Sequence, residues 1–244
     1  MKSKYIKLKS AIVAWLYFLI LWLVFNYPYW LMDNENADLL DSLIYNSSRS
    51  DSGYFSIKYL FIFYIVPFLL FIPYFVHAEN AEIVLKYKNR SQFYIARSLQ
   101  ILSAASIFSI CIISINIIGN YMLEHAHFLE YNYGIISLFN IFSMICIYFW
   151  IGLLYYIILD FWGWRLAFFL TFFLCAILGF GMIYFGLKWT PAGDVNLMDF
   201  LIIRKITYTQ SMVVIVREGM IAIIIFIIGL FLIDKKDFSL EQSK

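Results

Sequence analysis

Six runs of mostly apolar residues dominate the sequence and constrain its fold more than any other feature. A membrane-spanning helix needs about 20 consecutive apolar residues. The runs occupy residues 11–31, 57–77, 94–118, 134–159, 166–187 and 212–233. Because 63% of the residues are hydrophobic and only 14% are charged, the composition excludes a soluble globular domain. We therefore expect an all-α polytopic membrane protein with six transmembrane helices, five or seven being the alternatives.

Lysine and arginine predict how these spans are oriented, because positively charged residues near the ends of spans stay in the cytoplasm. The N-terminus, the loop after run two, the turn after run four and the C-terminal tail carry Lys2, Lys4, Lys7, Lys9, Lys86, Lys88, Arg90, Arg97, Arg165, Lys235, Lys236 and Lys244. Six crossings place all of them on one side, and the acidic residues of the first loop on the other. Basic residues in the fifth loop argue the other way, but aspartates accompany them. We expect a single domain, residues 1–244, with both termini cytoplasmic.

Charged side chains are absent from the middle of runs two to five, whose main polar groups are Asn116, Asn140 and scattered serines. A membrane enzyme needs ionisable groups within its spans, and none of the familiar catalytic or phosphate-binding motifs occurs. The cysteines and the His125–His127 pair lack the spacing of a metal site. We therefore expect neither catalysis nor a cofactor in this chain. The two asparagines either line a substrate pathway or hydrogen-bond between helices.

Arg217 and Glu218 are the charged residues inside the last apolar run. Ionisable residues in a span are costly and often functional. They either anchor the helix, by extending to the interface or by pairing with Asp199, Arg204 or Lys205 of the preceding stretch, or contribute to a gate or substrate contact. That preceding stretch, residues 194–210, interleaves apolar and charged side chains. Its pattern predicts an amphipathic, re-entrant region before the last span.

The segment between runs two and three, residues 78–90, has the pattern of a short helix. Acidic residues open it and basic residues close it, which suits the helix dipole. Glu82 and Lys86 also form a favourable pair four residues apart. Such a helix either lies on the membrane surface or docks on a cytosolic partner. The residues that we expect to make the contact are Glu79, Glu82, Ile83, Val84, Lys86, Tyr87 and Arg90.

This layout resembles the permease subunit of type-2 ATP-binding-cassette exporters. In that family a short coupling helix between spans two and three has an acidic start, an aliphatic middle and a turn that contains Ser or Arg. The residues that match it are Glu79, Glu82, Ile83, Leu85, Arg90, Ser91 and the span-opening Arg97. The last apolar run, its glycine and its short charged tail also match. The segment lacks the Gly-Thr and Pro-Val elements that many members carry.

The resemblance implies a permease dimer, homomeric or heteromeric, coupled to a cytosolic ATPase subunit that binds ATP and magnesium. It implies no contact with nucleic acid. An uncharged, aromatic-rich interior suits an amphipathic cargo, and the abundance of Ile, Asn, Lys, Tyr and Phe is typical of AT-rich bacterial genomes. We thus expect a bacterial cell-membrane protein for export of, or immunity against, an antimicrobial peptide. The alternative is a non-transporting membrane scaffold or sensor accessory that docks a cytosolic regulator.

Overall fold

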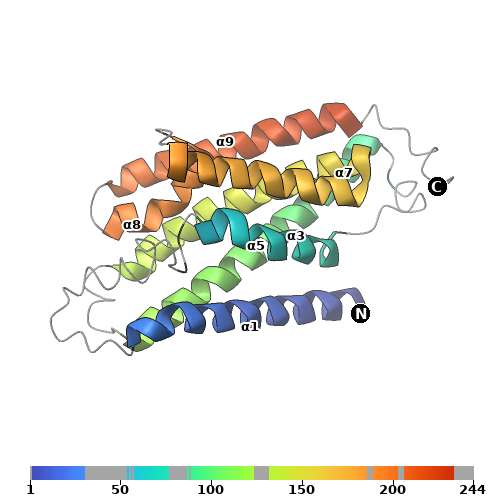
Figure 1. Cartoon of the computed structure of the whole chain (residues 1–244). Helices are drawn as coiled ribbons and strands as arrows, with labels where there is room; N and C mark the ends of the chain where they lie inside the picture. The colour runs from blue at the N-terminus through green and yellow to red at the C-terminus, as the bar shows by residue number, and fades with distance from the viewer. Residues whose placement is uncertain are drawn as a thin grey trace.

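The computed structural model of the chain is helical, and no strand occurs in the part of the chain that it describes (Figure 1). The residues that it describes are 2–30, 54, 56, 58–76, 87, 89–123, 132–185, 189–202 and 206–233. The long helices run lengthwise through one elongated body. The expectation of an all-α fold is thus confirmed.

The elements follow one another with short, less regular pieces between the long helices. They are α1 (Lys2–Trp30), the π-helix η2 (Tyr59–Phe63), α3 (Ile65–Phe71), the 3₁₀ helix η3 (Ile72–Tyr74), α5 (Arg90–Leu123), α7 (Tyr133–Phe185), the 3₁₀ helix η4 (Pro191–Asn196), α8 (Leu197–Ile202) and α9 (Tyr208–Ile233). Four of them, α1, α5, α7 and α9, are long and apolar enough to cross a membrane, and a shorter apolar helical stretch covers Tyr59–Tyr74.

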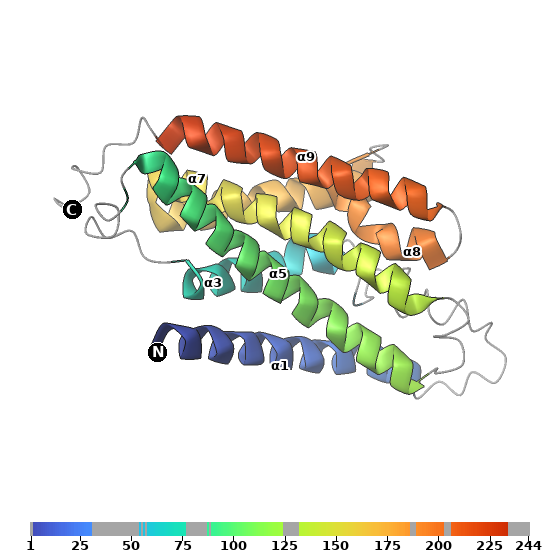
Figure 2. The same ribbon diagram turned by 180° about the vertical axis from the view of Figure 1, so that it is seen from behind.

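Helix α7 is interrupted at Gly163, whose φ of 78° and ψ of 170° are not helical. A positive φ carries little strain in glycine because it has no Cβ atom. Figures 1 and 2 show that the chain reverses here, so that the two arms of α7, residues 133–162 and 164–185, run in opposite directions. The reversal falls between the apolar runs 134–159 and 166–187 of the sequence.

The stretch Tyr59–Tyr74 passes from π to α to 3₁₀ geometry. The backbone N–H of Tyr64 donates to the carbonyl of Tyr59 at 2.7 Å, five residues back. Pro67 has no N–H to donate to the carbonyl of Phe63, the residue at which the π turn ends. The hydroxyl of Tyr148 donates to the Leu60 carbonyl at 3.0 Å, which ties this irregular segment to α7.

Aromatic rings from four elements form the centre of the core. Phe108 of α5 lies 5.1 Å from Phe18 of α1, 5.0 Å from Phe68 of α3 and 5.0 Å from Tyr148 of α7, measured between ring centroids. All four side chains are buried. Close packing and the edge-to-face or tilted geometry of the rings stabilise these contacts.

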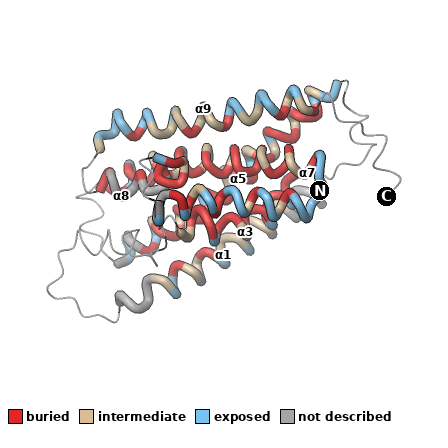
Figure 3. The backbone as a smooth tube through the Cα atoms, turned by 45° about the horizontal axis from the view of Figure 1, so that its top comes forward, coloured by how far each residue is buried: buried red, intermediate tan, exposed pale blue. Residues whose placement is uncertain are grey.

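Helix α5 crosses the molecule diagonally between the two outer helices (Figure 2). Near its start, Tyr94 packs on Phe226 of α9 with ring centroids 5.4 Å apart, and near its end Asn116 is hydrogen-bonded to Trp22 of α1. Of the 18 consecutive residues that are most apolar in each helix, 17% are buried in α1 and in α9, against 56% in α5 and 61% in α7. Figure 3 shows the same contrast between the outer α9 and the central helices.

Several chain positions meet at one end of the molecule. Helix α1 begins there, α9 ends there, α5 begins there, and the α7 arms are joined there (Figure 1). The six-span orientation predicted from the basic residues places these same points on one side. Which side of a membrane they face stays a prediction.

The contact between α5 and α9 predicts different effects for two glycines of α9. A Cβ atom on Gly229 would overlap the ring and hydroxyl of Tyr94, whereas one on Gly219 would meet no atom within 4 Å. Gly229→Ala should lower the free energy of unfolding by about 1–3 kcal/mol, the usual cost of overpacking. Gly219→Ala should leave it unchanged or raise it by up to about 1 kcal/mol.

The measurement is the loss of helical circular dichroism on titration of the micelle-bound protein with a denaturing detergent. Equal midpoints for the two variants would show that α5 and α9 do not pack through Gly229.

Candidate functional site

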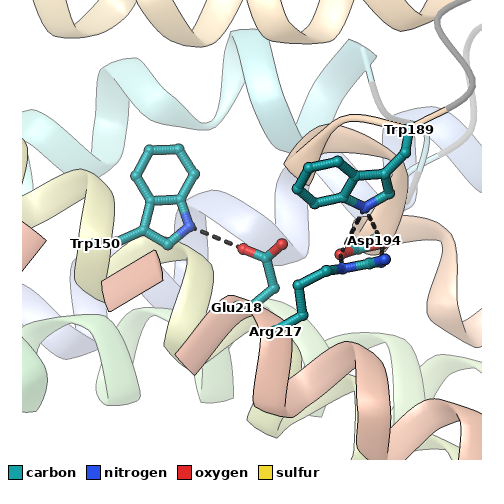
Figure 4. A network of polar contacts seen from close by, with 5 residues as sticks. All are labelled: Trp150, Trp189, Asp194, Arg217 and Glu218. Atoms are coloured by element: carbon teal, nitrogen blue, oxygen red, sulfur yellow. Dashed lines mark hydrogen bonds and ion pairs between the residues drawn. The ribbon is translucent and has the colours of Figure 1, made fainter. Parts of the chain in front are cut away.

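Among the residues that the structure describes, two groups of charged side chains lie within the helical body. The Arg97 cluster, formed by Arg97 and Asp160 with the rings around them, joins the start of α5 to the first arm of α7. The Glu218 cluster, formed by Trp150, Trp189, Asp194, Arg217 and Glu218, joins α7, η4 and α9 (Figure 4). Such groups are costly inside an apolar body and are the natural candidates for function.

The Arg97 cluster is built on an ion pair with two hydrogen bonds. Arg97 donates to the two oxygens of Asp160 through Nη1 at 2.8 Å and Nη2 at 2.5 Å. The two side chains are 2% and 3% exposed. The guanidinium carbon also lies 5.3–5.5 Å from the ring centroids of Phe93, Tyr94 and Tyr156. The paired carboxylate and the aromatic faces together offset the cost of removing the Arg97 guanidinium from water.

Helical periodicity on both sides brings this cluster together. Phe93 and Tyr94 precede Arg97 by one turn of α5, and Tyr156 precedes Asp160 by one turn of α7, so each charged residue shares a face with its aromatic neighbours. In the sequence, Arg97 counts toward the orientation of the spans and toward the family resemblance, and no partner is predicted for it. Asp160 is absent from the predicted residues because it lies one residue beyond the fourth apolar run. A lone acid at the basic end of an apolar run was the signal that pointed to it.

In the Glu218 cluster, Arg217 is held by Asp194. Its Nε donates to Asp194 Oδ2 at 2.9 Å and its Nη2 donates to Oδ1. Trp189 adds its indole N–H, 3.3 Å from Asp194 Oδ1, and its ring, whose centroid lies 4.6 Å from the guanidinium carbon. The Asp194 side chain is 6% exposed and that of Arg217 is 37% exposed. This pair therefore lies at the boundary between the interior and the surroundings.

Glu218 is buried more deeply, with 0% of the residue exposed. Its Oε2 accepts a hydrogen bond from the indole N–H of Trp150 at 2.9 Å. Its Oε1 has no hydrogen-bond partner among the residues that the structure describes. Figure 4 shows the carboxyl group between Trp150 and the Arg217–Asp194 pair. The cluster thus contains two carboxyl groups and one guanidinium group.

The position of Asp194 depends on the two short helices that precede α9. Thr190 is extended, with φ −144° and ψ 158°, and Pro191 then opens η4. Ala192, Leu197 and Leu201 are buried, and η4 and α8 pack against α7. Residues 194–210 were predicted to be an amphipathic re-entrant region. The structure gives two short helices over 191–202, while their entry into a membrane stays a prediction.

The other predicted pathway residues lie elsewhere. Asn116 accepts from Trp22 Nε1 at 3.1 Å and donates to Tyr133 Oη at 2.6 Å, so it bridges α1, α5 and α7. These bonds favour the structural interpretation of Asn116. Asn140 is buried on the first arm of α7 and belongs to neither cluster. Arg217 and Glu218 both belong to the Glu218 cluster. Arg217 binds Asp194 rather than extending to the interface alone.

The predicted coupling helix lies largely outside the described residues. This applies to Glu79, Glu82, Ile83, Val84 and Lys86. Tyr87 is described, and its ring packs edge-on against Phe93 with 5.6 Å between centroids. Arg90 is exposed and begins α5. These two residues therefore lie directly before the Arg97 cluster.

Comparisons with protein-family models, with curated proteins and with solved structures gave no match. Within the described ranges, no three His, Cys, Asp or Glu side chains are grouped as a metal site would require. The two clusters and the sequence are therefore the observations that bear on function.

The Arg97 cluster should be essential for stability as a pair rather than as two separate charges. Asp160→Asn keeps the shape but leaves Arg97 buried without its counter-ion, so we expect a loss of about 3–5 kcal/mol in the free energy of unfolding. The double variant Arg97→Met with Asp160→Leu should recover most of that loss, because both buried charges are gone.

The measurement is again denaturing-detergent titration, with Arg165→Met as the control, since Arg165 is exposed just beyond the turn of α7. A double variant no more stable than Asp160→Asn would contradict a simple compensating pair.

Proposed function

We propose that this chain is the transmembrane subunit of an ATP-binding-cassette exporter. Two such subunits would form the pathway, and a separate cytosolic ATPase would bind ATP and magnesium and supply the energy. The four long apolar helices and the helical fold support a membrane-embedded role. The sequence pattern around residues 78–97 supports the coupling of this membrane part to a cytosolic partner.

The single observation that carries this proposal is the buried Arg97–Asp160 pair. Residues 78–90 lead directly into α5, and Arg97 follows Arg90 by about 10 Å along the helix axis. At that point α5 is fastened to α7 by two charge-assisted hydrogen bonds, just before the α7 chain reverses. A displacement of the segment before α5 would thus be passed to both helices together.

Helix α5 would distribute such a movement across the molecule. Its first turns pack on α9 through Tyr94 and Phe226, and its second half is bonded to α1 through Asn116 and Trp22. Rotation of α5 therefore changes contacts with both outer helices. An exporter needs this kind of link between a cytosolic contact and the helices that enclose its pathway.

The membrane topology that we propose has six crossings. These are α1, the stretch 59–74, α5, the two arms of α7 and α9, with both termini in the cytoplasm of a bacterial cell. The second crossing is only about 24 Å long at 1.5 Å per residue, shorter than a hydrocarbon core of about 30 Å. A locally thinned bilayer or the neighbouring helices would accommodate the difference.

The cargo that we propose is an amphipathic peptide, exported or removed as a form of self-protection. The centre of the described core consists of Phe and Tyr rings rather than charges. Such an interior suits aromatic and aliphatic side chains better than a sugar or an inorganic ion.

Topology can be tested by thiol labelling in a background with the three native cysteines replaced by alanine. A membrane-impermeant maleimide should label Ser47→Cys in intact cells. It should label Ser3→Cys and Ser239→Cys only after lysis, because we place both termini inside. Labelling of either terminus in intact cells would contradict the proposed orientation.

Association with an ATPase is the test of function. The tagged chain purified from its native membranes in mild detergent should carry an ATPase subunit in stoichiometric amount. Glu82→Lys and Tyr87→Asp should each reduce that ATPase at least tenfold, since they place wrong charges on the proposed contact. Both variants should still insert in the membrane.

The matched control is Tyr208→Asp, which introduces the same charge at the first residue of α9, at the opposite end of the molecule. It should retain the ATPase. If a cytosolic protein without ATPase activity co-purifies instead, the scaffold or sensor interpretation replaces the exporter. If the ATPase is retained in the variants at positions 82 and 87, the contact lies elsewhere.

A further inference from the structure

We propose that Glu218 is a proton-binding site, in which the carboxyl group is neutral and its proton lies on Oε1, directed toward the carboxylate of Asp194. This inference concerns the Glu218 cluster alone and does not depend on the exporter assignment. It follows from the burial of Glu218, from its missing hydrogen bond and from the charges around it.

The hydrogen bonds of Glu218 are incomplete for a carboxylate. An ionised carboxylate accepts hydrogen bonds at both oxygens and, when buried, needs donors for both. Trp150 supplies one donor, to Oε2, and Oε1 has none within the described part of the chain. With 0% of the residue exposed, bulk water does not reach it. A proton on Oε1 turns this unsatisfied acceptor into a donor.

The charges of the cluster agree with a neutral Glu218. Arg217 is the neighbouring cation, but its Nε and Nη2 are both bonded to Asp194, and Trp189 covers its face. If Glu218 were ionised, two carboxylates would share one guanidinium inside an apolar body. A buried charge without its own partner is strongly unfavourable. Protonation of Glu218 makes the cluster neutral.

The groups that face Glu218 come from three elements. Arg217 precedes it on α9, Asp194 interacts with it from η4, and Cys146 interacts with it from α7. Neither Asp194 nor Cys146 is a cation. Two carboxyl groups placed side by side normally hold one proton between them, because they cannot both ionise cheaply. Asp194 is therefore the acceptor that the proton on Glu218 meets.

The bound proton has a structural consequence. A neutral Glu218 joins α9 to η4 through Asp194, while an ionised one repels that carboxylate and competes for Arg217. On release, the O–H bond of Glu218 breaks, the carboxylate keeps the electron pair, and the proton passes to water on the side where Trp189 and Arg217 are exposed. The docking of η4 and α8 on α9 therefore depends on whether the proton is bound.

Infrared spectroscopy of the full chain in lipid vesicles tests the site directly. Exposed Asp and Glu side chains are ionised at about pH 7, so a carbonyl band of a protonated carboxylic acid at that pH reports a buried neutral group. We expect this band in the native chain and its loss in Glu218→Gln, which keeps the size and shape of the side chain. Identical spectra for the two proteins at this pH would overturn the proposal.

Two further variants make the assignment specific. Glu124→Gln, a glutamate of the sequence between α5 and α7, should leave the band unchanged. Asp194→Asn removes the acceptor of the proton and frees Arg217 to pair with Glu218, so the band should disappear at a lower pH than in the native chain. A band that titrates identically in Asp194→Asn would overturn the role of Asp194. Monodisperse elution of each variant in size-exclusion chromatography confirms that it is folded.

Discussion

The cost of leaving a polar group unpaired in apolar surroundings governs this structure. It explains why the described chain is helical, since a helix satisfies its backbone internally. It also explains where the irregularities lie. The backbone breaks at a glycine at one end of the molecule, and the π turn of residues 59–63 offers a carbonyl that the hydroxyl of Tyr148 reaches. Charged side chains obey the same rule and occur inside as clusters with partners from other helices.

The two clusters satisfy that rule to different degrees. Arg97 and Asp160 balance each other in charge and share two hydrogen bonds, so this pair holds α5 and α7 together. The Glu218 cluster has one carboxyl group more than its guanidinium can neutralise, which makes its charge balance dependent on a proton. A matched pair transmits movement without changing state, whereas an unmatched cluster can exist in two states. The first therefore suits mechanical coupling, and the second suits a switch.

Sequence reasoning identified individual charged residues better than it identified their partners. Arg217 and Glu218 were recognised because charges are rare within apolar runs, but Asp194 and Trp150, which hold them, are 23 and 68 residues away. Asp160 was missed because it stands at the end of its run, 63 residues from Arg97. The sequence leaves Asn116 with a pathway and a structural interpretation, and its bonds to Trp22 and Tyr133 favour the structural one. In each case the deciding contact is distant in the sequence.

The sequence by itself determined that this chain is helical and apolar enough for a membrane. Composition and the length of apolar runs are local properties, and a helix of about 20 apolar residues is long enough to cross the hydrocarbon core. It also separated two apolar runs at residues 160–165, where the structure has the reversal at Gly163. Tertiary structure alone decided which helix faces meet, that α5 lies diagonally between α1 and α9, and which charges share a partner. Those outcomes depend on side-chain packing between distant segments, and no local pattern encodes them.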